Sequence, residues 1–211
     1  DCPWALPINS DEEYEVSVPR WPMKKVPGIT ATSSWNWESG FTKDNIAEAE
    51  EIRDYNLRAI FGTWDYLKNR SPEKEKYQTS RLNFAAYVLG KRESRRLMGD
   101  VILNQNDIIN RVSYPDSCVA ITWYFDIHYP HPQNSRFFPG EEFRSVAYDD
   151  PNWEKFSGGQ PGYYLPFKPY FMPFRCLYSR NIPNLMMAGR NISVSHVALA
   201  PSRVMITTGE M

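Results

Sequence analysis

The chain has 211 residues, enough for a domain with a sizeable core, and its 42% hydrophobic and 23% charged residues exclude general disorder. With 24 basic and 25 acidic residues, its net charge of −1 provides no attractive field for DNA or RNA. Its apolar runs are far shorter than the roughly 20 residues of a transmembrane span. We therefore predict no nucleic-acid partner and no transmembrane segment.

The clearest predicted element is a helix from Lys43 to Asn69, where apolar residues recur every three to five positions between charged ones. Thr42 is a good N-cap, and Ser71-Pro72 is expected to end the helix. The preceding aromatic stretch, residues 35–41, suits either stacking on a sugar or packing of the helix onto the core. The Pro-rich residues 2–28 predict strands and loops.

Residues 92–98 lie between Gly90 and Gly99, and a β-branched run follows up to Leu103. This pattern favours strand, turn and strand over a helix across residues 92–103. In an extended segment, Arg92 and Arg96 would share one face, and Glu93 and Arg95 the other. Two guanidiniums on one face suit a carboxylate, a phosphate or the electron-rich end of a flavin. The alternative is a surface strand with a local ion pair.

Two further elements follow. A short helical turn is predicted at residues 107–111, and a strand from Cys118 to Ile127. One face of this strand would carry Val119, Ile121, Trp123 and Phe125. We interpret His128, just beyond the strand, as a general base that Asp126 orients or tunes.

The sequence predicts no metal site. The prolines that follow His128 and His131 disfavour helical presentation of the pair. The cysteines, Cys2, Cys118 and Cys176, are odd in number and widely spaced, which excludes both a disulfide framework and a CxxC pair. We expect all three to be buried thiols.

Near the C-terminus, the apolar run from Leu185 to Ala188 predicts a buried strand that stops at Gly189, where backbone approaches another group. Short polar side chains follow, which are too polar for a core: Asn191, Ser193, Ser195 and His196. In open α/β sheets a ligand lies beyond the carboxyl end of a strand, near turn amides and a following helix. This stretch therefore suits the polar edge of a cofactor.

Three blocks in order carry a resemblance to a known family: Arg92-Glu-Ser-Arg-Arg-Leu-Met-Gly-Asp, Thr122-Trp-Tyr-Phe-Asp-Ile-His-Tyr-Pro, and Ile182-Pro-Asn-Leu-Met-Met-Ala-Gly-Arg-Asn-Ile-Ser-Val-Ser-His-Val-Ala. They resemble a bacterial family of FAD-dependent oxidoreductases, some members of which are labelled xanthan lyase. The resemblance covers residues 35–211 and implies FAD as cofactor, which carries the redox chemistry.

The resemblance also implies site residues. Catalytic or substrate-positioning roles fall on Arg92, Glu93, Arg95, Asp126 and His128. The residues expected to contact the flavin are Ala188, Gly189, Arg190, Asn191, Ser193, Ser195 and His196. Arg190 could stabilise a reduced, anionic flavin. The alternative readings are a structural role for His196 and simple packing for Arg203.

The predicted fold is α+β. Residues 1–179 are expected to form a substrate-side domain with an antiparallel sheet and one long helix, and residues 180–211 a C-terminal remnant of an α/β FAD-binding domain. The family begins with a Gly-x-Gly-x-x-Gly turn that holds the ADP half of FAD, and this sequence has no such motif. We therefore expect a fragment that lacks its N-terminal dinucleotide-binding segment, is inactive alone and does not bind FAD tightly.

A second hypothesis is a carbohydrate-binding protein or a polysaccharide lyase. The chain is 15% aromatic with seven Trp, and His128 with Arg92 or Arg95 would supply the base and the neutraliser of a uronate carboxylate. The Ala-Gly-Arg-Asn-Ile-Ser block has no role in a lyase. We therefore favour flavin-dependent chemistry on a small or carbohydrate-like substrate.

Overall fold

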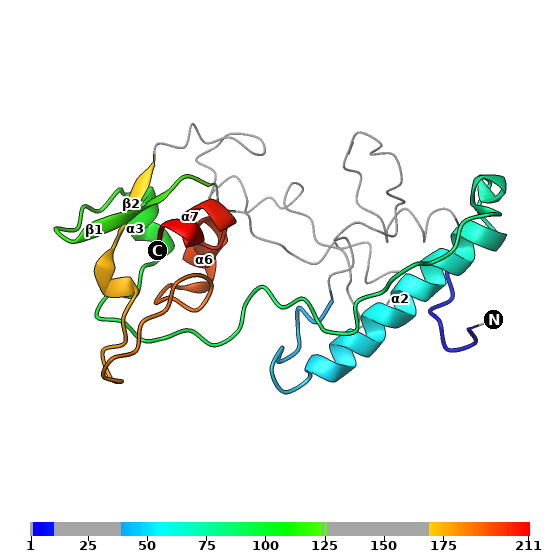
Figure 1. Ribbon diagram of the computed structural model, residues 1–211, viewed down its shortest axis with the longest axis horizontal. Helices are drawn as coiled ribbons and strands as arrows, with labels where there is room; N and C mark the ends of the chain where they lie inside the picture. Colours follow the sequence, from blue (N-terminus) through cyan, green and yellow to red (C-terminus); the bar gives the residue numbers. More distant parts are fainter. Residues whose placement is uncertain (1, 11–38, 124, 126–168) are drawn as a thin grey trace. The chain divides into compact units, whose positions relative to one another are not determined.

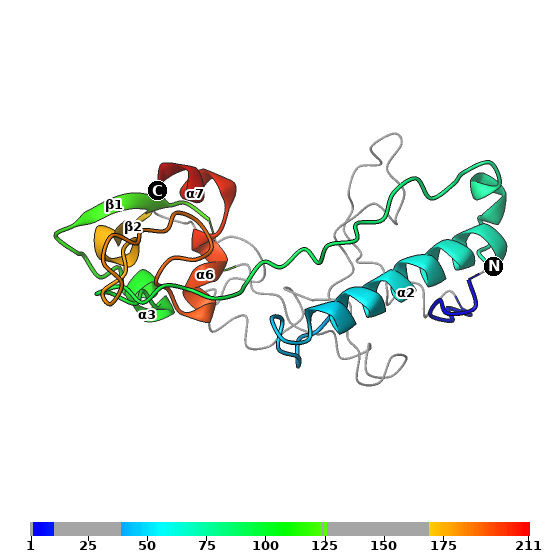
Figure 2. The same cartoon turned by 60° about the horizontal axis from the view of Figure 1, so that its bottom comes forward.

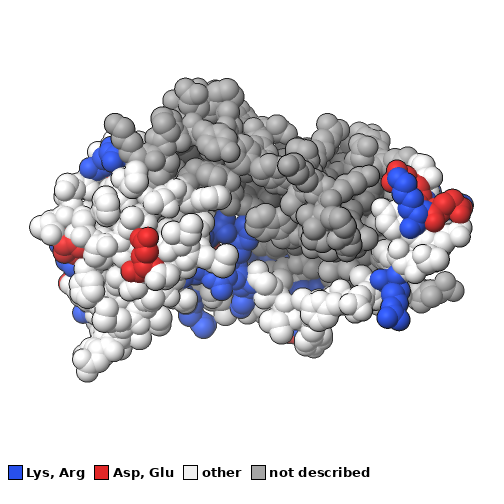
Figure 3. Space-filling model, turned by 45° about the horizontal axis from the view of Figure 1, so that its top comes forward, with Lys and Arg blue, Asp and Glu red and all other residues white. Residues whose placement is uncertain are grey.

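The computed structural model describes residues 2–10, 39–123, 125 and 169–211. These residues belong to two compact units. Unit 1 holds the described residues up to 90, and unit 2 holds those from 91 onward. Figure 1 colours the described residues along the sequence, and Figure 3 marks basic side chains in blue and acidic ones in red on one face. Residues 179 and 180, where the sequence predicts a domain boundary, both lie in unit 2.

Unit 1 is built around the helix α2, Ala49–Asn69, whose buried face includes Ile52, Ala59 and Tyr66. The helix was predicted to start at Lys43 after an N-cap at Thr42, and both predictions are wrong. Oδ1 of Asp44 instead accepts hydrogen bonds from the backbone N–H groups of residues 46 and 47, at 2.8 and 3.1 Å. Such local side-chain bonds compete with helix formation. The predicted end of the helix, before Ser71-Pro72, is confirmed.

The N-terminal segment lies along α2 (Figure 2). The Leu6 N–H donates to the carbonyl oxygen of Arg58 at 3.0 Å, and Ile8 is fully buried. Gly62 makes this approach possible, because a Cβ there would lie 2.0 Å from the carbonyl oxygen of Leu6. After α2, a 3-10 helix, η2, spans Lys74–Tyr77.

Unit 2 contains a two-stranded antiparallel sheet, in which β1, Ser117–Ile121, pairs with β2, Tyr170–Pro173 (Figures 1 and 2). Val119 and Ile121 are buried, as the predicted alternation requires. The strand ends at Ile121, earlier than predicted, and Trp123 is 40% exposed because it lies beyond the ladder. The small sheet and the surrounding helices agree with the predicted α+β class.

Short helices complete unit 2: α3, Gln105–Ile109; η3, Phe174–Cys176; α6, His196–Ser202; and α7, Met205–Glu210. The predicted helical turn near residue 107 is confirmed as α3, which starts at a capping box formed by Asn104 and Asp107. The helix α7 lies against β1, where Oε2 of Glu210 accepts a hydrogen bond from the backbone N–H of Ala120 at 3.2 Å.

The cysteines differ from the prediction. Cys176 is buried, but Cys2 and Cys118 are exposed, so the expectation of three buried thiols is wrong for two of them. Cys118 is the second residue of β1, and its Sγ contacts the carbonyl oxygen of Met172 at 3.7 Å. Within the described part of the chain, no helix is long and apolar enough to cross a membrane.

Candidate functional site

The candidate site of unit 2 lies where residues 91–103 run parallel to residues 189–196. The Leu97 N–H donates to the carbonyl oxygen of Asn191 at 2.8 Å, and the Leu103 N–H donates to that of Ser193 at 3.0 Å. Leu103 and Val194 form an isolated parallel bridge. The structure therefore brings the two segments with the predicted site residues side by side.

The predicted strand, turn and strand at residues 92–103 is wrong. The backbone N–H groups of this segment form hydrogen bonds with two different parts of the chain, one at Ser193 and one at Arg175. The Gly99 N–H donates to Oγ of Ser193 at 3.0 Å, whereas the Val101 N–H points to the carbonyl oxygen of Arg175 at 3.5 Å. A continuous ladder is thus interrupted. Gly99 is required here, since a Cβ would lie 2.3 Å from the carbonyl oxygen of Arg175.

Two predicted cofactor-binding side chains bond to the backbone of the predicted substrate segment. Nη1 of Arg190 donates to the carbonyl oxygen of Lys91 at 2.6 Å, and Nδ2 of Asn191 donates to that of Arg95 at 2.9 Å. Both residues are exposed. Their side chains fix the position of residues 91–95 against the loop that starts at Gly189.

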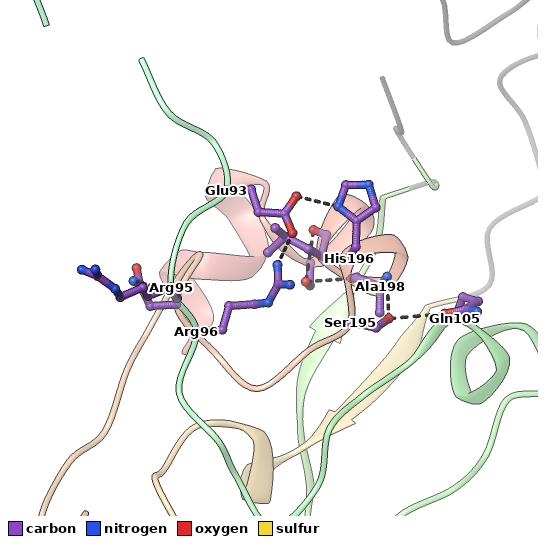
Figure 4. Close-up of polar contacts among 10 residues, drawn as sticks. Glu93, Arg95, Arg96, Gln105, Ser195, His196 and Ala198 are labelled. Atoms are coloured by element: carbon purple, nitrogen blue, oxygen red, sulfur yellow. Dashed lines mark hydrogen bonds and ion pairs between the residues drawn. The ribbon is translucent and has the colours of Figure 1, made fainter. Parts of the chain in front are cut away.

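The centre of the site is a group of three side chains, Glu93, Arg96 and His196 (Figure 4). Oε2 of Glu93 lies 2.6 Å from Nδ1 of His196, although the residues are 103 positions apart. Oε1 of the same carboxylate accepts a hydrogen bond from Arg96. The expectation that residues 93 and 96 face opposite ways is therefore wrong, because the segment is not a regular strand.

Each member of the pair changes the pKa of the other. The hydrogen bond to Glu93 raises the pKa of His196 above its ordinary value, and this effect outweighs burial and the charges of Arg96 and Arg203, which lower it. Burial raises the pKa of Glu93, but the hydrogen bonds from His196 and Arg96 together outweigh it, so the pKa is lowered. Glu93 is therefore a carboxylate at neutral pH.

Arg95 is not part of this group. Its side chain is exposed and points away from Glu93 and His196 (Figure 4). Its guanidinium makes no polar contact with any residue that the structure describes. Arg92 is half-buried on the same segment. The resemblance implied that Glu93 and Arg95 position the substrate together, but their side chains point in different directions.

Two of the predicted cofactor-binding serines have structural roles. Ser193 is buried, with its Oγ bonded to Gly99 and its N–H donating to the carbonyl oxygen of Cys176 at 2.9 Å, so it is not too polar for the core. Ser195 is the N-cap of α6, where its Oγ accepts from the Ala198 N–H at 3.3 Å. Both side chains support the loop.

The predicted buried strand at residues 185–188 is wrong. Met186 makes only an isolated bridge with Tyr178 and is 55% exposed, and Ala188 is exposed as well. The chain instead turns at Asn184, which has a φ of 62°, and folds back along residues 177–179. Gly189 was expected at a close approach of backbone to another group; among the described residues an added Cβ would come no nearer than 4.0 Å to an atom, but the φ of 110° favours glycine.

Asp126 and His128 lie outside the described residues, so their roles stay predictions. Among the residues that are described, no group of three metal-binding side chains occurs. Arg96 was expected to share a face with Arg92 and to meet an anionic ligand, with a local ion pair as the alternative. The structure shows the ion pair, between Arg96 and Glu93.

A family model described as FAD dependent oxidoreductase matches residues 7–211. The chain belongs to this family. No curated protein and no solved structure matches it. Family membership confirms the resemblance at the level of an FAD-dependent oxidoreductase, and it makes FAD the cofactor to consider at the site.

The loop of this FAD-dependent oxidoreductase has a donor set that fits the polar edge of a flavin. Ala188, Arg190 and Asn191 are exposed, and His196 follows at the start of α6. Gly189 is buried, its N–H donates to Sδ of Met211 at 3.0 Å, and an added Cβ would be in ordinary van der Waals contact with Cγ2 of Thr208 at 4.0 Å. Ser193 does not fit a cofactor contact, because it is buried and bonded to Gly99.

Proposed function

We propose that the chain is part of a flavin-dependent oxidoreductase in which residues 188–196 contact FAD and residues 92–95 contact a small or carbohydrate-like substrate. The observation that carries this proposal is the 2.6 Å contact between Glu93 and His196. It joins a residue expected on the substrate side to one expected on the cofactor side. The matched family supplies the class of chemistry.

The residues would divide the work as follows. Arg190 and Asn191 provide hydrogen-bond donors to the cofactor, His196 lies beside it at the start of α6, and the exposed Ala188 lets the ring approach closely. FAD, when bound, supplies the acceptor or donor of a hydride. The cation at Arg190 favours negative charge that develops nearby. Arg92 and Arg95 provide guanidiniums for an anionic or hydroxyl group of the substrate.

Ser193 and Ser195 have a different part in the proposal. Their hydrogen bonds to Gly99 and to the first turn of α6 hold the loop in one conformation. A preorganised loop is what a precise binding site requires. Asp126 and His128 remain candidates for proton transfer on the substrate side.

The test is an absorbance spectrum of the purified full-length protein, with analysis of the extracted cofactor. The expected result is a visible flavin spectrum and FAD in the extract. Arg190→Gln should weaken FAD binding, whereas the matched variant Arg180→Gln should not. Arg180 is exposed, and among the described residues its side chain forms a hydrogen bond only with the sulfur of Met98. Absence of flavin after reconstitution, together with cleavage of an acidic polysaccharide to an unsaturated sugar, would support the lyase hypothesis instead.

A further inference from the structure

The pair of Glu93 and His196 leaves one nitrogen of the imidazole open. Nδ1 is engaged by the carboxylate at 2.6 Å, and 64% of the histidine side chain is exposed. No described residue forms a hydrogen bond with Nε2. A ligand in the site can therefore reach this nitrogen.

The chemistry of the pair determines which nitrogen carries hydrogen. Glu93 is ionised at neutral pH because hydrogen bonds from His196 and Arg96 lower its pKa, and an ionised carboxylate only accepts hydrogen bonds. Nδ1 of a neutral His196 must then carry the hydrogen and donate it to Glu93. Nε2 is left with a lone pair, which is the form of a histidine that accepts a proton.

The backbone around His196 is held in place. The N–H of Ser195 donates to the carbonyl oxygen of Leu103 at 2.8 Å, and the Ser195 side chain caps the helix that His196 begins. Glu93 is also fixed, because Arg96 holds its other oxygen. The imidazole is thus oriented from both sides, as a group that transfers a proton should be.

We propose that Nε2 of His196 is the proton acceptor in the oxidation of an alcohol by this flavoenzyme, with Glu93 as its positioning residue. This inference rests on the proposed function. The substrate carbon loses a hydride, with both electrons of its C–H bond, to oxidised FAD. The hydroxyl proton passes to Nε2 as the O–H bond breaks, and the product is a carbonyl compound. In the reverse direction the imidazolium returns the proton.

The charged groups around His196 set the pH at which this role is possible. Glu93 and Arg96 face it from residues 91–96, and Arg203 faces it from the end of α6. Glu93 favours the imidazolium, both arginines oppose it, and the net direction is a raised pKa. The proton-accepting form therefore increases as the pH rises through a value above the ordinary 6.5.

The first experiment is NMR titration of the full-length protein with ¹⁵N-labelled histidine. The chain printed here has three histidines, and His196→Gln identifies the resonance that belongs to position 196. The expected result is a neutral His196 with hydrogen on Nδ1 and a raised pKa. Glu93→Gln should return the pKa of His196 toward its ordinary value. The hydrogen of the neutral imidazole should then no longer be confined to Nδ1. Glu75→Gln, at an exposed residue of unit 1, should match the wild type.

The second experiment follows anaerobic reduction of bound FAD by a panel of sugars and simple alcohols. His196→Gln should lower the rate constant of reduction at saturating substrate about 100-fold or more. Glu93→Gln should move the acidic limb of the pH profile to lower pH, because the pKa of His196 falls when the carboxylate is removed. A structural role for Glu93 would lower stability without moving this limb.

The outcomes separate the inference from the function on which it rests. A wild-type His196 with hydrogen on Nε2, or a His196 that Glu93→Gln leaves unchanged, overturns the inference even if FAD binds. Reduction by no member of the panel overturns the alcohol class. A protein that binds no FAD overturns the proposed function, while a Glu93-dependent tautomer would still show that the pair forms.

Discussion

Asp116 and Arg175 form a bidentate ion pair across 59 positions of sequence. Nη2 of Arg175 lies 2.8 Å from Oδ1 of Asp116, and Nε lies 3.0 Å from Oδ2. The Arg175 backbone N–H also donates to Oδ2 at 3.0 Å. The pair joins the start of β1 to η3, whose following residues lead to the candidate site.

This pair predicts how stability depends on pH. The side-chain hydrogen bonds from Arg175 lower the pKa of Asp116 from 3.8 to about 2. Because the pKa is lower in the folded state, ionised Asp116 stabilises the fold above pH 3.8, and this stabilisation is lost as the pH falls through about 2. Chemical denaturation at a series of pH values should show a steeper loss in the wild type than in Asp116→Asn.

Arg175→Gln provides the complementary variant. It removes the partner and leaves the carboxylate, so the pKa of Asp116 should move back toward 3.8 and the acid-dependent loss of stability should be smaller than in the wild type. If the two variants and the wild type have the same pH dependence, the ion pair does not form in solution.

Gly99→Ala should destabilise unit 2. A Cβ at this position would lie 2.3 Å from the carbonyl oxygen of Arg175 and 3.0 Å from Cβ of Ser193. Because the nearest atom belongs to the backbone, relief requires movement of a whole segment. We expect a loss of about 1–3 kcal/mol in the free energy of unfolding, measured by urea denaturation.

Gly209→Ala is the matched control for Gly99→Ala. Gly209 lies in α7, and a Cβ there would meet no atom within 4 Å. Since alanine favours helix, this change should be neutral or stabilising by up to about 1 kcal/mol. Equal losses in both variants would contradict the close approach at Gly99.

The sequence predicted correctly those elements that depend on residues close to one another in the chain. The body and end of α2 follow from apolar periodicity and from Ser71-Pro72, and α3 follows from its capping residues. The start of α2 was missed because one carboxylate, that of Asp44, turns the chain before the helix. The strands predicted at residues 92–103 do not form, because two separate segments share the hydrogen bonds of this stretch, which no local pattern records.

The candidate site shows the same division. Sequence patterns selected Glu93 and His196 individually. They did not show that Glu93 contacts His196, because the contact depends on how residues 97–103 align with 191–195. Ser193 was assigned to a cofactor because a serine in a polar stretch is indistinguishable, in sequence, from a serine that bonds to buried backbone.

Cys176 should be unreactive toward thiol reagents in the folded protein. It is fully buried, and burial raises the pKa of its thiol to about 12. Brief labelling with iodoacetamide near pH 8, followed by mass spectrometry of peptides, should modify the exposed Cys2 and leave Cys176 unmodified. Labelling of Cys176 should rise only in denaturant. Rapid labelling of Cys176 without denaturant would contradict its burial.

Ser193→Ala distinguishes a structural serine from a cofactor ligand. Loss of Oγ leaves the buried N–H of Gly99 without its acceptor, which should cost about 1–3 kcal/mol of unfolding free energy. A direct flavin contact would instead lower FAD affinity in a variant of normal stability. Ser195→Ala is the comparison, since loss of a helix cap should cost about 0.5–2 kcal/mol. Urea denaturation and FAD titration of both variants distinguish these roles. A loss of FAD affinity in Ser193→Ala with unchanged stability would show that Ser193 contacts the cofactor.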